Sequence, residues 1–367
     1  IFLDVRYTLK SRDGLLPAGT ELAHDQIAIA QGLRYGRKIV PGTPAVEMTG
    51  ATTVLSGTTD DRAQLPWAIA FDRTTGALSS YRLAGRELLA APLLPCFSRA
   101  VTDNDVGFQY HPAGARIFSR QMALWPAPQF VPESFEVTTT DDYAEVKTVF
   151  EPLYGMVRVE TCYRIHADGT LVGTLRTFDG GDMASAPEFF RVGMETTLPG
   201  RYSTVDFYGK GPYETYSDRQ SSARTGHYVQ SVAEQYHYGY VHPQESGTHV
   251  GLKWFRLTDD SGYGLEITSP AQFSASALPF TRQDLTDFSS PFASEELSSV
   301  SSRYSHSEEL RPAAHEADRS RGVTHLNFDL VQRGLGCIDS FGSLPRPEYR
   351  IPADAYTFEF VISPLYR

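Results

Sequence analysis

The sequence predicts an antiparallel all-β fold, built as a sandwich or a barrel. Apolar and polar residues alternate with a period of two in many segments. Leu326 and Phe328, for example, fall on one face of a predicted strand, and Asn327 and Asp329 fall on the other. Turn residues separate these runs at short intervals. Tyrosine and phenylalanine, at 20 and 21 residues, are abundant and favour strands.

The predicted strands follow one another through short turns. Hairpin patterns cover residues 68–88, 135–150 and 157–178. The third of these turns at Asp168-Gly169, a pair typical of tight hairpins. Residues 356–362 form a further alternating run near the C-terminus. We expect these strands to pair antiparallel with their sequence neighbours.

Only two segments are typical of helices, and both are short. In residues 281–288, Thr281 and Asp284 have the spacing of a capping box, with Asp in place of the usual Glu or Gln. Residues 305–317 carry the second helical pattern. The segment 283–320 is rich in serine and charge, so we expect a long surface excursion there.

A stretch rich in proline and glycine at residues 41–50 indicates a domain boundary. We therefore expect two parts, residues 1–45 and residues 50–367. The first part has too few strands to bury a core alone. It either completes a domain whose other half is absent or packs on the main domain. Because the chain opens with Ile1 inside a predicted strand, we expect a fragment or a processed chain.

The composition excludes several classes of partner. A net charge of -11 without a basic block makes nucleic acid and anionic membranes poor candidates. No apolar run approaches the roughly 18 residues of a membrane span. The cysteines, Cys96, Cys162 and Cys337, are widely spaced and odd in number, which favours neither a zinc site nor a disulfide framework.

Asp103, Asn104 and Asp105 stand together before a glycine and raise the question of a metal site. An EF-hand loop would need further ligands and a glutamate at fixed spacing, and these are missing. We interpret the segment as a loop held by hydrogen bonds from these side chains to nearby backbone, with Arg99 as a charge partner.

The stretch "YGKGPYETYSDR" (208–219) has glycines on both sides of Lys210. It lacks the GK[ST] of a phosphate-binding loop and the strand–helix context of a dinucleotide site. Glu214 and Asp218 could act chemically, but we favour salt bridges to Arg219 or Lys210.

Residues 237–249 combine His242 and Glu245 with several tyrosines. A histidine with a carboxylate suits a metal site or an acid/base pair. Aromatic and amide side chains also suit sugar binding, where rings stack on pyranose faces. A polar loop lined by aromatic rings is the structural alternative.

Residues 335–345 place Phe341 in a turn beside Asp339. An aromatic side chain in such a Gly/Ser-rich loop is either a lid over a core or a platform for a ligand. Composition alone favours the lid.

Taken together, these stretches resemble the C-terminal part of the glycoside hydrolase family 2 β-galactosidases. The segments that carry the resemblance are "FSRAVTDNDVG", "YGKGPYETYSDR", "YVHPQESG" and "LNFDLVQRGLGCIDSFG". They occur in the family's order and extend from about residue 50 to the end. Ser246 stands where the family usually has Asn, and Cys337 and Ile338 stand where it has Gly and Asp.

The resemblance implies a fold for both parts of the chain. Residues 50–367 would form the family's last domain, a large antiparallel supersandwich similar to galactose mutarotase. Residues 1–45 resemble the last strands of the preceding immunoglobulin-like β-sandwich.

The resemblance also implies a place at the sugar pocket, with this domain forming one wall. Phe341 occupies the position of a tryptophan that contacts the sugar in the family. Because phenylalanine has less area and no indole N–H, we expect weaker stacking. Asp339 would bind substrate beside it, and His242 and Glu245 are further candidate sugar contacts. Arg99 and residues 103–105 would form a loop at the pocket's border.

No residue of this chain is assigned a catalytic role. Retaining glycosidases use two carboxylates about 5 Å apart. In the resembled family these lie on a TIM barrel upstream of every segment present here. The family's Mg²⁺ and Na⁺ sites are expected mainly on that barrel, so we expect no metal or cofactor in this chain.

The expected function is therefore that of the C-terminal part of a β-galactosidase, with a barrel supplied in cis or in trans and a β-galactoside as ligand. The parent enzyme is expected to be a homo-oligomer. The alternatives are a stand-alone carbohydrate-binding module and a mutarotase-like isomerase using His242 and Glu245. The compartment stays open between cytoplasm, which is favoured, and periplasm or exterior.

Overall fold

The structure, a computed structural model, describes residues 1–30, 39–59, 62–107, 118, 120–240, 243–289, 322–336, 338–339 and 343–366. The chain divides into two compact units, Ile1–Gly36 and Arg37–Arg367.

The smaller unit contains one antiparallel pair, β1 (Phe2–Thr8) and β2 (Glu21–Ala28). Leu3, Tyr7 and Ile27 project on one face of this pair and are 48%, 53% and 51% exposed. A two-stranded ribbon by itself is marginally stable in water.

The larger unit is all-β, and every pairing between its described strands is antiparallel, as the sequence predicts. The strands are β3 (Ala45–Thr49), β4 (Thr52–Thr58), β5 (Pro66–Asp72), β6 (Leu78–Leu83), β7 (Arg86–Glu87), β8 (Ala91–Cys96), β9 (Pro132–Thr139), β10 (Ala144–Phe150), β11 (Val157–Ile165), β12 (Leu171–Asp179), β13 (Arg191–Pro199), β14 (Thr204–Gly211), β15 (Arg224–Ser231), β16 (His249–Thr258), β17 (Gly264–Leu278), β18 (Val323–Gln332) and β19 (Tyr356–Leu365). The predicted hairpins correspond to β5–β6–β7, β9–β10 and β11–β12.

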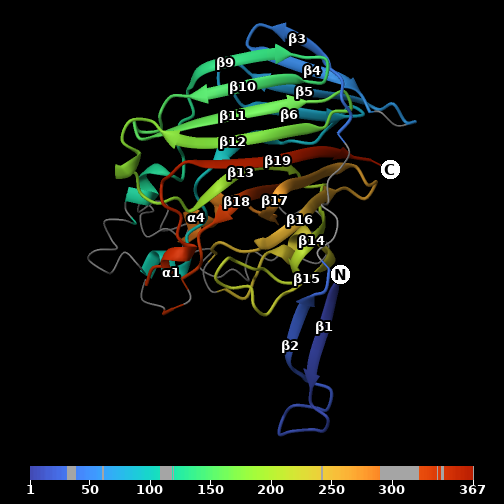
Figure 1. The fold of residues 1–367 in the computed structure, drawn as a ribbon, viewed down its shortest axis with the longest axis vertical. Coiled ribbons are helices and arrows are strands. Elements are labelled where there is room, and N and C mark those ends of the chain that lie inside the picture. Colours follow the sequence, from blue (N-terminus) through green and yellow to red (C-terminus); the bar gives the residue numbers. More distant parts are fainter. Residues whose placement is uncertain are drawn as a thin grey trace. The chain divides into compact units, whose positions relative to one another are not determined.

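The long strand β17 is the branch point of this large curled sheet. Its first half, residues 264–268, pairs with β19, from which the sheet continues through β12, β11 and β10 to β9. Its second half, residues 274–278, pairs with β18, and this arm continues through β13, β8, β6, β5 and β4 to β3. The strands β16, β14 and β15 extend the sheet from β17 in the remaining direction. Figure 1 shows β3 and β9 at one end of this unit and β15 at the other.

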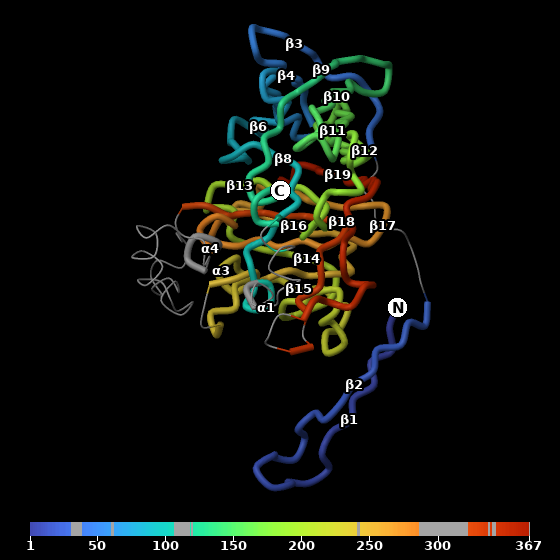
Figure 2. The backbone as a smooth tube through the Cα atoms, turned by 90° about the vertical axis from the view of Figure 1, so that its left-hand side faces the viewer, coloured from blue at the N-terminus to red at the C-terminus, as the bar shows by residue number. Residues whose placement is uncertain are grey.

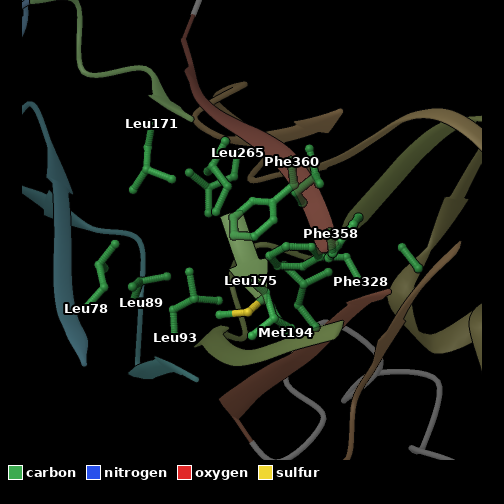
Figure 3. Close-up of a cluster of buried hydrophobic side chains, with 14 of the residues drawn as sticks. Leu78, Leu89, Leu93, Leu171, Leu175, Met194, Leu265, Phe328, Phe358 and Phe360 are labelled. Atoms are coloured by element: carbon green, nitrogen blue, oxygen red, sulfur yellow. The ribbon is translucent and has the colours of Figure 1, made fainter. Parts of the chain in front are cut away.

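The two arms face each other across the main hydrophobic core. Figure 2 shows β4, β6 and β8 on one side and β10, β11 and β12 on the other. Leu78 and Leu93 from one arm approach Leu265 and Ile362 from the other around one small apolar cavity. The close-up in Figure 3 shows the same arrangement, with leucines from the first arm pointing toward Phe358 and Phe360 of β19. The alternation read from the sequence therefore supplies both inner faces of a sandwich.

Helices are few and short. Among the described residues, the helices whose bounds are assigned are α1 (Asp103–Gly107), α3 (Val232–Gln235) and α4 (Arg282–Ser289), with the 3₁₀ turns η2 (Met183–Ser185) and η6 (Pro347–Tyr349). At the start of α4, Asp284 N donates to Thr281 Oγ1 at 3.1 Å, and Thr281 N donates to Asp284 Oδ2 at 2.9 Å, which confirms the predicted capping box. The second predicted helix, residues 305–317, lies outside the described residues. Among the helices that are described, none has the length and apolar character needed to cross a bilayer.

Candidate functional site

Asp103, Asn104 and Asp105 open the short helix α1, where the sequence predicts a loop. Arg99 and Asp105 are both buried and form a two-pronged ion pair, with Nε–Oδ2 and Nη2–Oδ1 distances of 3.1 and 3.0 Å. Asp105 also accepts the backbone N–H of Thr102 at 3.1 Å. Burial raises the pKa of Asp105, but the charges of Arg99 and Arg333 and the hydrogen bonds from Arg99 and Thr102 together bring the pKa below its usual value. The predicted charge partner of this segment is therefore confirmed.

The two preceding side chains bond to segments that are distant in sequence. Asp103 N donates to Gln244 Oε1 at 3.1 Å, and Gln244 Nε2 donates to Asp103 Oδ2 at 3.0 Å. Asn104 Nδ2 donates to the carbonyl oxygen of Leu335 at 2.9 Å. The prediction of a bond to nearby backbone is wrong for Asn104, because the fold brings a carbonyl group 231 residues away into reach.

Residues 333–336, which we call the glycine strap, follow β18 and lie against this helix. Arg99 Nη1 donates to the carbonyl of Arg333 at 2.6 Å, and Arg99 Nη2 donates to that of Gly334 at 3.2 Å. One buried guanidinium therefore joins Asp105 to the strap, and Asn104 adds a bond to the next carbonyl along.

Glu214 and Asp218 lie in the loop that joins β14 to β15 and have different partners. Glu214 pairs with Arg219, which is one of the predicted ion pairs. Asp218 instead accepts the backbone N–H groups of Leu335 and Gly336 at 3.0 and 2.9 Å. This loop is therefore a second support for the glycine strap.

Glu214 also holds the loop that precedes β16. Its Oε2 accepts hydrogen bonds from Ser246 Oγ at 2.9 Å and from Gly247 N at 2.8 Å, and its Oε1 accepts one from Tyr240 OH at 2.7 Å. Burial raises the pKa of Glu214, but these bonds and the charge of Arg219 bring it below its usual value. The carboxylate is thus fully engaged in holding structure.

Glu245 on the same loop is buried and pairs with Arg191 of β13, at an Nη2–Oε2 distance of 3.1 Å. Arg191 Nη1 also lies 3.5 Å from Asp329 Oδ2 of β18. Gly193 leaves room for Asp329, since a Cβ at this position would lie 2.1 Å from Asp329 Oδ1. Burial, opposed by Arg191 and reinforced by Glu245, raises the pKa of Asp329 to about 7.

A second buried ionic group lies further along β13. Arg282, the first residue of α4, donates to both oxygens of Glu195 at 3.1 and 3.2 Å. His325 Nε2 lies 3.7 Å from the same carboxylate. Burial raises the pKa of Glu195, but Arg282 and His325 lower it to about 2. Burial together with Glu195 raises the pKa of the Cys96 thiol to about 12, so this thiol is unreactive.

The predicted sugar contacts are only partly described. Phe341 and His242 lie outside the described residues. Asp339 is exposed, and it accepts hydrogen bonds from Ser343 N at 3.2 Å and from Ser343 Oγ at 2.5 Å. Glu245, in contrast, is buried and paired.

The structure thus assembles four sequence segments into one interlocked site. Each of the helix α1, the β14–β15 loop, the loop before β16 and the glycine strap bonds to two of the other three segments. The sequence analysis misses the roles of Arg191 and Glu195. Their opposite charges, four residues apart on one face of the strand β13, are the signal that could have indicated them.

Three carboxylates of this arrangement are poor candidates for acid/base chemistry. The carboxylates of Asp105, Glu214 and Glu245 are committed to arginines. Within the described part of the chain, no group of three or more histidine, cysteine or acidic side chains is placed to hold a metal ion.

Comparison with known proteins identifies the family of the chain. The chain matches the family model for the β-galactosidase small chain over residues 63–362. It is 28% identical over 357 residues to a β-galactosidase of Priestia megaterium, covering 95% of this chain and 30% of that protein. It is 30% identical over 362 residues to a β-galactosidase of Bifidobacterium adolescentis, covering 96% of this chain and 31% of that protein.

Among solved structures, the chain is similar to a galactose mutarotase related enzyme from Lactobacillus acidophilus, with a TM-score of 0.40 and 7% identity, over 84% of this chain and 97% of that one. The chain spans about a third of the length of the curated relatives it matches. Because the family model covers most of its length, the chain belongs to the β-galactosidase small chain family.

Proposed function

We propose that this chain is the C-terminal part of a glycoside hydrolase family 2 β-galactosidase, which hydrolyses terminal β-D-galactosides. The observation that carries the proposal is the assembly of the four family-like segments into one site, where they contact one another through buried side chains.

Catalysis in this proposal comes from a TIM barrel outside this chain, joined in cis or supplied in trans. A retaining glycosidase needs an acid/base carboxylate and a nucleophilic carboxylate about 5 Å apart. Glu214 and Glu245 are poor candidates, because an arginine holds each of them, and further hydrogen bonds hold Glu214 while Thr248 donates one to Glu245. The Mg²⁺ and Na⁺ sites of the enzyme are proposed to lie on the barrel as well.

The role proposed for this chain is to form one wall of the sugar pocket. Phe341 and Asp339 would meet the galactoside, and Arg99 with residues 103–105 would border the pocket. His242 and Glu245 are weaker candidates for sugar contacts, and the burial of Glu245 against Arg191 speaks against it. The assembled enzyme is proposed to be a homo-oligomer that has no nucleic acid or membrane partner.

The smaller unit is proposed to complete a preceding β-sandwich. Its apolar face, with Leu3, Tyr7 and Ile27 largely exposed, needs further strands to cover it. The relatives that this chain matches are about three times as long, so additional chain is available for such a domain.

The test is an assay with a chromogenic β-galactoside, on this chain alone and on the chain together with the proposed barrel. We expect turnover only with the barrel. Turnover by the chain alone at an enzyme-like rate would refute the proposal that catalysis comes from the barrel. Calorimetry with galactose and lactose on the chain alone tests the binding-module alternative, which millimolar or tighter binding would favour.

The isomerase alternative requires Glu245 to act as an acid or a base. The ion pair of Glu245 with Arg191 and its hydrogen bond from Thr248 oppose this role. Polarimetry on α-galactose would decide the matter, since a rate above background that a His242→Ala variant loses would establish it.

A further inference from the structure

The backbone of the glycine strap has an unusually complete set of partners for a segment outside a strand. Its N–H groups donate in turn to Phe190 O, to Tyr349 O and, for the last two residues, to Asp218. Its first three carbonyls accept from Arg99 twice and from Asn104 once. Side chains on one flank therefore serve the carbonyls, while Asp218 serves the N–H groups at the far end.

The carboxylate of Asp218 lies so close to Gly334 that a side chain at residue 334 would clash with it. A Cβ at Gly334 would lie 2.4 Å from Asp218 Oδ2, so glycine is needed for the carboxylate to reach the backbone. Two hydrogen bonds from N–H groups to one ionised carboxylate are charge-assisted and stronger than neutral ones.

The strap ends where the segment with Asp339 begins. Gly336 lies beside Ser343, since a Cβ on Gly336 would be 3.1 Å from Ser343 O. Asp339 bonds back to Ser343 N and Oγ. Residues 336 and 343 thus form the two sides of a narrow base, and Asp218 fixes one of them through Gly336 N.

We propose that Asp218 is a positioning residue for galactoside binding, which fixes the base of the segment that carries Asp339 without touching the sugar itself. The inference rests on the proposed function, in which Asp339 faces the substrate. Loss of the carboxylate leaves Leu335 N and Gly336 N without their acceptor, and Asp339, three residues further along, is then held less firmly for the sugar. The cost falls on binding more than on the chemical step, because the proposed catalytic carboxylates lie elsewhere.

The experiment compares Asp218→Asn and Asp218→Ala with wild type in the complete enzyme, with the catalytic part proposed above. Asn keeps the shape and one acceptor, whereas Ala removes both acceptors. We expect KM for a chromogenic galactoside to rise by up to about tenfold in the Ala variant and less in the Asn variant, which is the scale of one or two hydrogen bonds. We expect little change in kcat for either variant.

Asp179→Ala is the matched control. Asp179 also accepts two backbone N–H groups, from Gly181 and Met183 at 2.9 and 3.2 Å, in the turn after β12. A purely structural role would lower the melting temperature in both positions and leave KM unchanged in both. An unchanged KM in a folded Asp218→Asn enzyme would overturn the proposal, and this variant also decides the outcome if the Ala variant fails to fold.

Hydrogen exchange separates this inference from the proposed function. We expect faster exchange at the amides of Leu335 and Gly336 in Asp218→Asn than in wild type. A complete wild-type enzyme without galactosidase activity would refute the proposed function, and the exchange data would then still show whether Asp218 fixes the segment. Unchanged exchange would refute the positioning role whatever the activity.

Discussion

The two faces of strands β13 and β18 are both buried, yet they have opposite chemistry. One face carries Met194, Leu326 and Phe328, which pack in the main core. The other face carries Arg191 and Asp329 among other polar residues, beneath the loop before β16 and the start of α4. In many antiparallel sheets one face packs on the core and the polar face is exposed to water. Here the loops of the candidate site cover it.

The difference teaches how each face is stabilised. Apolar burial is non-directional and scales with the area removed from water. The polar face depends on pairing, and among the described residues Arg191 Nε, Asn327 Nδ2 and Asp329 Oδ1 find no hydrogen-bond partner. Unpaired buried groups cost free energy, so the stability of this face depends on the ion pairs that it does form.

The largest effect is expected on the apolar face. Phe328 is fully buried and packs against Phe360, with ring centroids 5.1 Å apart. Phe328→Ala should lower the free energy of unfolding by about 4 kcal/mol, through lost transfer energy and a residual cavity. The shift of the urea midpoint measures it, with Phe328→Leu as the milder control. A loss below about 1 kcal/mol would mean that this face is not the main source of stability.

Removing an ion pair from the polar face should lower the free energy of unfolding slightly less than Phe328→Ala does. Arg191→Met leaves Glu245 without its cation in a buried site, and we expect a loss of about 3 kcal/mol. A double variant with Glu245→Gln removes the stranded charge and should recover part of the loss. If the double variant is as unstable as the single one, packing rather than charge explains the effect. Urea denaturation of both variants gives the comparison.

The pH dependence of the polar face should have a defined sign. The pKa of Asp329 is raised to about 7 in the folded state, so ionising this group opposes folding as pH rises from about 4 to about 7. Asp329→Asn cannot ionise. We therefore expect its stability relative to wild type to increase by about 2 kcal/mol between pH 5 and pH 7.5. Thermal melts of both proteins at the two values check this, and a difference that does not change with pH would refute it.

The smallest effect is expected for an ion pair outside both buried faces. Lys147 Nζ lies 3.0 Å from Glu160 Oε2 across β10 and β11, and the lysine side chain is partly exposed. Lys147→Ala should change the free energy of unfolding by less than about 1 kcal/mol, because water and salt screen such pairs. A larger loss of unfolding free energy in urea denaturation would show that exposed and buried ion pairs contribute similarly to stability.

Local features of the sequence predict much of the fold. The hairpin at residues 157–178 and the capping box at Thr281 and Asp284 both depend on groups a few residues apart. The pair Glu214–Arg219 is local in the same sense. Alternation also placed Asn327 and Asp329 correctly on the face opposite Leu326, although it could not tell that this face is buried.

The candidate site was less predictable, because its contacts join segments far apart in the chain. Asp103 meets Gln244 and Asn104 meets Leu335 across 141 and 231 residues. Which distant groups come together depends on the register of β18 against β13 and β17, and no short-range pattern encodes that register.

The sequence by itself determined the class of fold, the order of the strands and the residue types available for the site. The period of two and the turn residues depend on neighbouring residues only, so they can be recognised in the sequence. Only the tertiary structure decided that β17 divides the sheet into two arms, that a polar sheet face is covered by loops, and that Arg99 and Asp218 serve the backbone of the strap. These outcomes depend on long-range pairing, where buried polar groups take whichever partner the fold brings within hydrogen-bonding distance.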